Sequence, residues 1–146
     1  MADVDIRAAA PRDIDAIHEL ELRAFPAPWR REFFESELRA SGRLSLVARR
    51  EGEVIGYLFA MWFFDEMHVN KIAVAEEERR RGVALKMMEH CFRFARANRI
   101  ESISLEVRES NIGAQEFYKR LDFEPTYKRP RYYPDGESAV VMMRKC

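Results

Sequence analysis

Three consecutive arginines followed by a glycine form the segment of this sequence best suited to binding an anion. Arg79, Arg80 and Arg81 lie between a run typical of a strand, residues 69–74, and a run with helical periodicity. The first turn of a helix leaves backbone N–H groups without intrahelical partners, and the helix dipole favours negative charge there. Gly82 has no side chain to block a ligand's approach to those groups. A diphosphate is the ligand that this arrangement would hold best; the alternative is a solvated arginine run at the start of an ordinary helix.

A single carboxylate lies in the middle of a second strand-like run. Residues 102–107 alternate between apolar and polar side chains, and Glu106 is on the polar side. A carboxylate in a strand that helices should cover is costly unless it has a partner or a chemical task. Glu106 therefore indicates either a general base, which accepts a proton from a reacting group, or a salt bridge to one of the arginines nearby.

Helical and strand-like runs alternate along the whole chain. Hydrophobic periodicity and turn residues predict strands over residues 5–9, 44–50, 54–64, 69–74, 102–107, 123–133 and 137–145. The same signals predict a helix that starts at residues 11–13, a helix over 30–40, a helix that starts after residue 82 and runs to 98, and a helix over 111–121. Strands followed by two strand–helix crossovers and a final hairpin predict an α/β fold. We expect one domain over residues 1–146, with a mixed, mostly antiparallel sheet and helices on both faces.

Composition restricts the class of protein further. The 146 residues suffice for one domain with its own core. Basic and acidic residues number 25 each, so no overall charge favours nucleic acid as a partner. Cys91 and Cys146 have neither metal-site spacing nor a disulfide framework, and we expect no metal. The apolar run 54–64 is too short to cross a membrane, and no signal peptide opens the chain, so we expect a cytoplasmic protein without a membrane partner.

Several motifs, in order along the chain, resemble one superfamily. Arg79-x-x-Gly82-x-Ala84 resembles the coenzyme A pyrophosphate loop of the GNAT (Gcn5-related) N-acetyltransferases. Two further blocks of that superfamily are matched by Leu105-Glu106-Val107-Arg108-Glu109-Ser110-Asn111 and by Phe117-Tyr118-x-x-Leu121-Asp122-Phe123. With Pro28-Trp29 and Arg131-Tyr132-Tyr133-Pro134, the set resembles the RimI branch, which acetylates protein N-termini. The resemblance covers nearly the whole chain.

This resemblance implies acetyl-CoA as the cosubstrate and assigns residues to it. The strand residues that would face the pantetheine arm are Ile72, Ala73 and Val74, with the Val74 N–H directed at the thioester oxygen. The residues that would hold the diphosphate are Arg79, Arg80, Arg81, Gly82, Val83, Ala84 and Leu85. Asn111 would bind the pantetheine, cap the following helix, or do both.

The resemblance also implies two catalytic residues. Glu106 matches the base, and Tyr118 matches the family position that protonates the leaving thiolate. The alternative for Tyr118 is a core aromatic on a helix face. His68, six residues before Val74, is expected to be structural, or to help the proton leave through water.

Aromatic residues near both ends of the chain are expected at the peptide substrate. Phe25 and Trp29 lie in a proline-broken link between helices, which is either a packing device or the border of the peptide groove. Arg131, Tyr132 and Tyr133 resemble the hairpin that closes over the substrate's first residue. Adjacent strand residues point to opposite faces, so one of the two tyrosines is expected in the core.

The expected function is acetyl transfer to the N-terminal α-amine of a protein, in a ternary complex. The RimI resemblance implies an N-terminal alanine of a small-subunit ribosomal protein as substrate. Lys71 and Asn70 depart from the commoner RimI pattern, which leaves the peptide preference open. Asp122 stands where the family usually has glycine, which bears on stability. The rivals are a broader N-terminal or small-amine acetyltransferase and a non-catalytic acyl-CoA-binding module, which needs neither Glu106 nor Tyr118.

Overall fold

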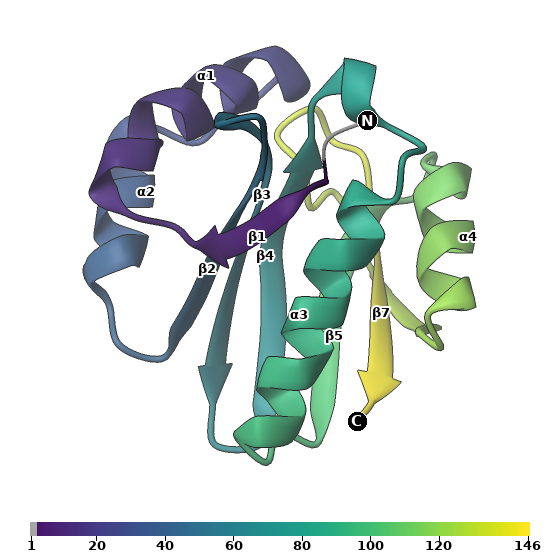
Figure 1. The fold of residues 1–146 in the computed structure, drawn as a ribbon. Helices are drawn as coiled ribbons and strands as arrows, with labels where there is room; N and C mark the ends of the chain where they lie inside the picture. The colour runs from purple at the N-terminus through teal and green to yellow at the C-terminus, as the bar shows by residue number, and fades with distance from the viewer. Residues whose placement is uncertain (1–2) are drawn as a thin grey trace.

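A seven-stranded sheet runs through residues 3–146, which are the residues described by the computed structural model. The strand order is β1-β2-β3-β4-β5-β7-β6 (Figure 1). The strands are β1 (Asp5–Ala8), β2 (Arg43–Arg50), β3 (Glu53–Phe63), β4 (Glu66–Val74), β5 (Ser102–Arg108), β6 (Glu124–Arg129) and β7 (Ala139–Lys145). The α-helices are α1 (Ile14–Ala24), α2 (Arg31–Arg39), α3 (Val83–Ala97) and α4 (Ile112–Arg120), and short 3-10 turns lie at Pro11–Asp13 and Glu76–Glu78.

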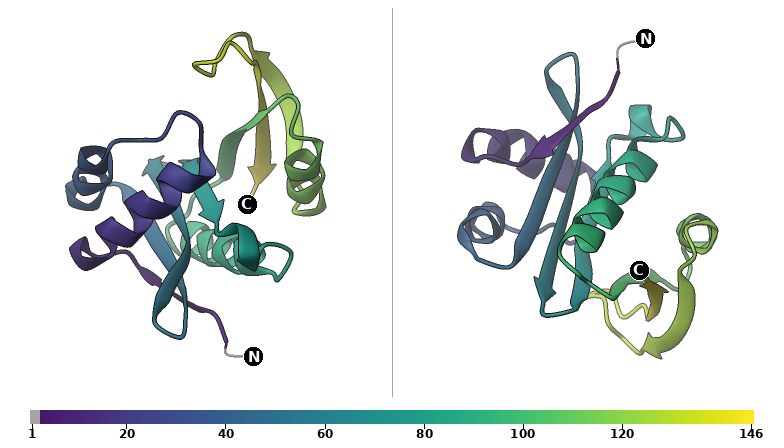
Figure 2. Two further views of the ribbon diagram at one scale, coloured as in Figure 1. Left: turned by 90° about the horizontal axis from the view of Figure 1, so that it is seen from above. Right: turned by 60° about the horizontal axis from the view of Figure 1, so that its bottom comes forward.

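Helices cover both faces of this sheet, as the sequence predicts. Figure 2 shows α1 and α2 on one side and α3 and α4 on the other. Ile17, Leu20 and Phe34 pack on the first face, and Met88 and Cys91 of α3 pack on the second. Every strand pair is antiparallel except β4 with β5. The mixed, mostly antiparallel α/β fold is confirmed.

The two parallel strands, β4 and β5, separate halfway along their length. They pair only from Glu66 and Ser102 to Val69 and Leu105. At that point the β3–β4 register shifts, because Phe59 is opposite Lys71 while Ala60 is opposite Val69. Asn70 is therefore the extra residue of a β-bulge, which bends its strand and ends regular pairing. Beyond the bulge, β4 has no strand partner on its β5 side within residues 3–146, and a slot opens in the middle of the sheet.

The segments on either side of this slot begin the two crossover helices. Gly82 precedes α3 with a φ of 81°, in the left-handed region that glycine tolerates best. Asn111 precedes α4, and its side chain accepts a hydrogen bond from the Ala114 N–H at 3.1 Å, so its capping role is confirmed. Asp122, after α4, has a φ of 67°, the left-handed conformation for which the family usually has glycine.

The last hairpin differs from its prediction. The strand expected over residues 123–133 ends at Arg129, and β7 begins at Ala139 rather than at residue 137. Residues 130–138 form a loop, in which Arg131 has a φ of 53°. The alternation of a strand therefore does not apply to Tyr132 and Tyr133. The expectation that one of them lies in the core is wrong: neither belongs to the core clusters, and both line the same cavity.

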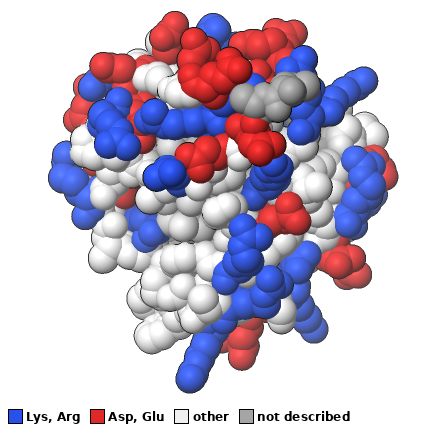
Figure 3. Space-filling view, in the orientation of Figure 1, with Lys and Arg blue, Asp and Glu red and all other residues white. Residues whose placement is uncertain are grey.

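Both signs of charge are present on the face seen in Figure 3. Asp and Glu side chains gather toward the top of this view, and Lys and Arg side chains are more frequent below them. Within residues 3–146, no helix combines the length and the apolar character needed to cross a bilayer.

Candidate active site

A cavity of about 510 Å³ lies at the slot between β4 and β5. Its wall combines both strands with α4, the α1–α2 link and the β6–β7 loop. The lining residues are Phe25, Pro26, Ala27, Trp29, Val69, Asn70, Lys71, Ile72, Leu105, Glu106, Val107, Arg108, Asn111, Ala114, Tyr118, Tyr132, Tyr133 and Pro134. Segments from both sides of the sheet therefore meet at one space, as a reaction between two substrates requires.

Glu106 is held in this cavity by two neighbours from different elements. His68 Nε2 lies 3.0 Å from both carboxylate oxygens, with hydrogen-bond geometry only to Oε1. The Tyr132 hydroxyl donates to Oε1 at 3.0 Å, and Nδ1 of His68 lies 2.7 Å from the Ser104 hydroxyl. Oε2 is buried and has no hydrogen-bond partner among the described residues. The carboxylate is thus fixed in position through Oε1, while Oε2 accepts no hydrogen bond from the described residues.

These neighbours also set the charge of Glu106. Burial by itself raises the pKa of this carboxyl, but the hydrogen bonds from His68 and Tyr132 and the positive charge of Arg129 outweigh it. The pKa of Glu106 therefore lies below its ordinary value, and the group is a carboxylate at neutral pH. The contact at Glu106 is a hydrogen-bonded cluster with a histidine and a tyrosine rather than the arginine salt bridge that was the alternative.

Tyr118 contributes to both the core and the cavity. Its ring packs against Phe117 and Phe123 at centroid distances of 5.1 and 5.6 Å. The residue is almost fully buried, and it lines the cavity from α4, seven residues after Asn111. Burial raises the pKa of the Tyr118 phenol above its ordinary value, so the hydroxyl keeps its proton at neutral pH.

The predicted phosphate loop lies before α3 and is open to solvent. Arg79, Arg80 and Gly82 are exposed, and a side chain at Gly82 would meet no protein atom within 4 Å. The side chain of Val83 is buried in the core, so only its main chain is placed to face a ligand. Arg81 lies 3.8 Å from Glu78, which offsets part of its charge. The loop has the open backbone and the positive side chains that a diphosphate would require.

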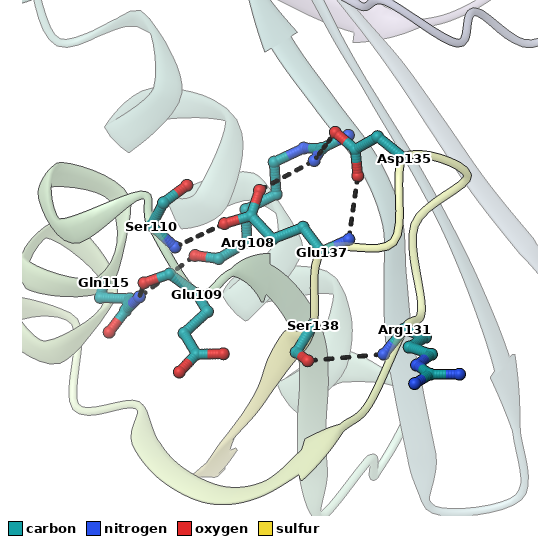
Figure 4. Close-up of polar contacts among 8 residues, drawn as sticks. All are labelled: Arg108, Glu109, Ser110, Gln115, Arg131, Asp135, Glu137 and Ser138. Atoms are coloured by element: carbon teal, nitrogen blue, oxygen red, sulfur yellow. Dashed lines mark hydrogen bonds and ion pairs between the residues drawn. The ribbon is translucent and has the colours of Figure 1, made fainter.

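The β6–β7 loop is held against the end of β5 by Arg108 (Figure 4). Its Nη1 donates to Asp135 at 2.8 Å and to Glu137 at 2.9 Å. The guanidinium also lies 4.1 Å from the centre of the Tyr133 ring. Glu137 in turn accepts a hydrogen bond from the Ser110 N–H at 2.8 Å. One side chain therefore connects the loop that carries Tyr132 and Tyr133 with the segment that leads into α4.

Hydrogen bonds to charged groups stabilise this connection. The hydrogen bond from Ser110 and the charge of Arg108 hold the pKa of Glu137 below its ordinary value. Burial raises the pKa of Tyr133 to about 12, which keeps its phenol neutral. Arg131 is exposed and does not line the cavity; its main chain N–H donates to the Ser138 hydroxyl at 3.4 Å.

The opposite wall contains a buried ion pair that sequence reasoning missed. Glu21 of α1 is 0% exposed and accepts hydrogen bonds from Lys71 Nζ and the Trp29 N–H, each at 2.9 Å, and from the Tyr57 hydroxyl. Its position had a sequence signal, because an acid four residues after Ile17 falls on the apolar stripe of α1. Glu21 thereby holds the α1–α2 link, which contains Trp29, against the sheet.

The structure brings eight of the eighteen predicted site residues together at the cavity. Those that line the cavity are Phe25, Trp29, Ile72, Glu106, Asn111, Tyr118, Tyr132 and Tyr133. Those outside its lining are Ala73, Val74, Arg131 and the loop residues 79–85. Phe25 and Trp29 also pack on the apolar cluster beneath α1 and α2, which confirms the packing interpretation, while contact with a peptide stays a prediction. His68, Lys71 and Arg108 join the site through contacts that no local pattern predicts.

Comparisons with known proteins agree with this geometry. The model of the acetyltransferase (GNAT) family matches residues 14–123. An N-alpha-acetyltransferase of Saccharolobus solfataricus is 33% identical over 155 residues, covering 97% of this chain and 93% of the relative. The ribosomal protein bS18-alanine N-acetyltransferase of Escherichia coli is 29% identical over 133 residues, covering 89% of each.

Solved structures give the same result for the fold. The crystal structure of the ribosomal-protein-S18-alanine N-acetyltransferase from Escherichia coli superposes with a TM-score of 0.91 and 27% identity, covering 98% of this chain and 94% of that one. The family match spans most of the described residues. The two relatives are named as N-acetyltransferases, and this chain aligns with nearly their whole length. The chain therefore belongs to the acetyltransferase (GNAT) family, and it is an N-acetyltransferase.

Proposed function

We propose that this N-acetyltransferase transfers the acetyl group of acetyl-CoA directly to the α-amine of a protein N-terminus. The observation that carries the proposal is Glu106, an ionised carboxylate held by His68 and Tyr132 in a cavity shared by both sides of the sheet. Relatives named as ribosomal protein bS18-alanine N-acetyltransferases and relatives named as N-alpha-acetyltransferases match with similar identity. They support an N-terminal amine as the substrate, with a ribosomal protein as one member of the class.

The residues present fit acetyl-CoA. Among the described residues no strand pairs with Ile72 and Val74 on the β5 side of β4, which suits an extended arm with amide groups. The open backbone at Gly82 and the arginines beside it suit the diphosphate. Bound there, acetyl-CoA supplies the reactive thioester. The Val74 N–H would polarise the thioester carbonyl, and a donor of this kind is worth about 3 kcal/mol.

The proton movements follow from the two titratable groups at the cavity. The substrate amine forms a bond to the acetyl carbon as the carbon–sulphur bond breaks. Glu106 takes the amine's proton, directly or through water, with His68 and Tyr132 holding the carboxylate. Tyr118 gives its proton to the departing thiolate. Because the pKa of Glu106 is low, it suits an amine that gives up its proton readily.

An N-terminal amine is that kind of substrate. An α-amine has a pKa near 7.8 and a lysine side chain one near 10.4, a difference of about 3.5 kcal/mol at about 1.36 kcal/mol per unit. At pH 7 roughly one α-amine in seven is neutral, against fewer than one lysine in a thousand. A weak carboxylate base therefore discriminates strongly in favour of the N-terminus.

A peptide with a free N-terminal alanine and one internal lysine tests the proposal. Mass spectrometry after incubation with acetyl-CoA should place the acetyl group on the α-amine. The same peptide with a formylated N-terminus serves as the control and should remain unmodified. Equal acetylation of the lysine in both peptides would contradict the N-terminal assignment.

A further inference from the structure

Lys71 is a charged residue of the cavity that the proposed chemistry does not use. It lies on β4 directly before Ile72, and its side chain is only 13% exposed. Its Nζ lies 3.7 Å from the centre of the Phe25 ring and 4.8 Å from the centre of the Trp29 ring. The ammonium therefore sits against the aromatic wall formed by the α1–α2 link.

The hydrogen-bonding capacity of this ammonium exceeds its partners in the protein. An ammonium group has three N–H donors. Among the described residues only Glu21 accepts one of them, at 2.9 Å, and the aromatic faces attract the charge without providing an acceptor atom. Because Lys71 lines the cavity, its remaining donors are available to an oxygen atom of a substrate bound there.

The surroundings of Lys71 restrict which oxygen is suitable. Glu21 is 0% exposed and balances the charge of Lys71, so the pair is neutral as a whole. A substrate carboxylate would place a second negative charge beside the buried Glu21. A neutral hydroxyl accepts a hydrogen bond from the ammonium without that repulsion. The pair is therefore matched to an alcohol rather than to an acid.

The position of Lys71 relative to Glu106 indicates which part of the peptide reaches it. Both residues line the same cavity, from neighbouring strands. The reacting amine has to approach Glu106, and the first side chain is attached to the carbon next to that amine. The first side chain of the substrate is thus the group placed to meet Lys71.

We propose that Lys71 is a specificity-determining residue that favours N-termini beginning with serine or threonine over those beginning with alanine or valine. It does so by donating a hydrogen bond to the hydroxyl of the first side chain. This inference rests on the proposed function, because it concerns the substrate of the same site.

Four peptides that differ only in their first residue test it. Serine against alanine and threonine against valine are pairs of similar volume that differ by one hydroxyl. The wild-type kcat/KM should be about 10- to 100-fold higher for the hydroxyl member of each pair, as expected for one hydrogen bond to a charged donor. Equal values within both pairs would overturn the inference.

Two variants locate the preference in Lys71. Lys71→Met removes the donors and keeps the length of the side chain, but it leaves Glu21 buried without its partner. Lys71→Met combined with Glu21→Gln removes both charges, and thermal unfolding confirms that it folds. In both variants the serine-to-alanine ratio should fall to about one, whereas the exposed control Lys145→Met should retain it.

The remaining outcomes are equally decisive. A ratio that survives in the double variant would overturn the role of Lys71. An equal rise in KM for all four peptides in the Lys71 variants, relative to wild type, would show that Lys71 binds the peptide main chain. That result would also overturn the proposed selectivity. Acetylation of alanine peptides without a serine preference contradicts this inference alone. If the wild type acetylates none of the free N-termini, the proposed function fails with it.

Discussion

The pKa values of Glu106 and Tyr118 are shifted in opposite directions from their ordinary values. Hydrogen bonds from His68 and Tyr132 keep the pKa of Glu106 low despite its burial, so the base that we propose is present in its ionised form. Burial raises the pKa of Tyr118, so the acid that we propose is present in its protonated form. Two titratable groups with pKa values pushed apart at one cavity are typical of an acid–base pair.

Replacing Glu106 by glutamine should lower turnover by about 10²- to 10⁴-fold at pH 7 without loss of acetyl-CoA binding. The pKa of Glu106 is lowered, so the group is ionised throughout pH 6–9, and the wild type can accept the protonated amine and remove its proton over that range. Without the base, only amine that is already neutral reacts. The ratio of mutant to wild-type rate should therefore increase as the pH rises past about 7.8.

A pH–rate series on one peptide measures this ratio. Glu109→Gln is the matched control, because Glu109 is an exposed carboxylate that pairs with Lys128 outside the cavity. Parallel curves for Glu106→Gln and wild type would remove Glu106 as the base.

Tyr118→Phe deletes one hydroxyl and keeps the ring that packs on Phe117 and Phe123. Calorimetric titration should show unchanged affinity for acetyl-CoA, while kcat falls by about 10- to 1000-fold. Tyr127→Phe makes the same chemical change at an exposed position of β6 and should keep wild-type kcat. Wild-type turnover in Tyr118→Phe would leave this tyrosine with a packing role only.

The two loops around the substrate side of the cavity are each held by an ion-pair cluster. Glu21 and Lys71 fix the α1–α2 link, and Arg108 with Asp135 and Glu137 fixes the β6–β7 loop. Loops positioned by a rigid scaffold commonly carry binding residues. Here the clusters hold aromatic residues on both sides of one space, so the loops act as opposing walls for the peptide.

Arg108→Gln should loosen the β6–β7 wall without unfolding the sheet. Tyr132 and Tyr133 would lose their fixed position, so the KM for the peptide should rise by about 10-fold while acetyl-CoA affinity changes little. Amide hydrogen exchange of residues 130–138 should speed up in the same variant. Peptide KM and exchange rates provide two independent measurements.

The matched control is Lys128→Gln, which breaks the exposed pair with Glu109 close to the same loop. Exposed pairs contribute about 0–1 kcal/mol, so this variant should behave as wild type. Identical effects in both variants would mean that Arg108 has no special part in holding the wall.

Across the whole molecule, one mixed sheet separates into two halves at the bulge in β4. The half with β1 to β4 carries the α1–α2 link and the arginine loop before α3, whereas the half with β5, β7 and β6 carries α4 and the β6–β7 loop. The slot between them is where both substrates would meet. A ligand that spans the slot binds only the folded state and should stabilise the whole protein.

Acetyl-CoA at about 100 times its dissociation constant should add about 2.7 kcal/mol, which raises Tm by about 5–10 °C. Gly82→Glu should abolish this shift, because a carboxylate would occupy the space of the diphosphate. Gly52→Glu is the matched control: φ is 83° at Gly52 and 81° at Gly82, and a Cβ added at either glycine would meet no protein atom within 4 Å. An unchanged shift in Gly82→Glu would move the diphosphate site away from this loop.

Local patterns in the sequence were sufficient for the elements and for the residues that act within one element. Strand and helix periodicities predicted the alternating elements, and Asn111 was correctly expected to cap its helix, because these properties depend on neighbours a few residues apart. The family resemblance could be recognised because its motifs lie in short contiguous blocks, and the match of the family model confirms it. The last hairpin was the exception, since residues 130–138 leave the strand to contact Arg108 and Ser110 elsewhere in the chain.

Contacts between distant residues were decided only by the tertiary structure. His68 meets Glu106 because β4 and β5 are neighbours in register, and Tyr132 reaches the same carboxylate from the loop before β7. Lys71 meets Glu21 because α1 packs across β4. The spacing of residues in the sequence does not predict these pairs. The order of the strands and the packing of the helices determine which distant side chains come together. Long-range packing thus decided which residues hold the carboxylate of Glu106 and which residues surround the ammonium of Lys71.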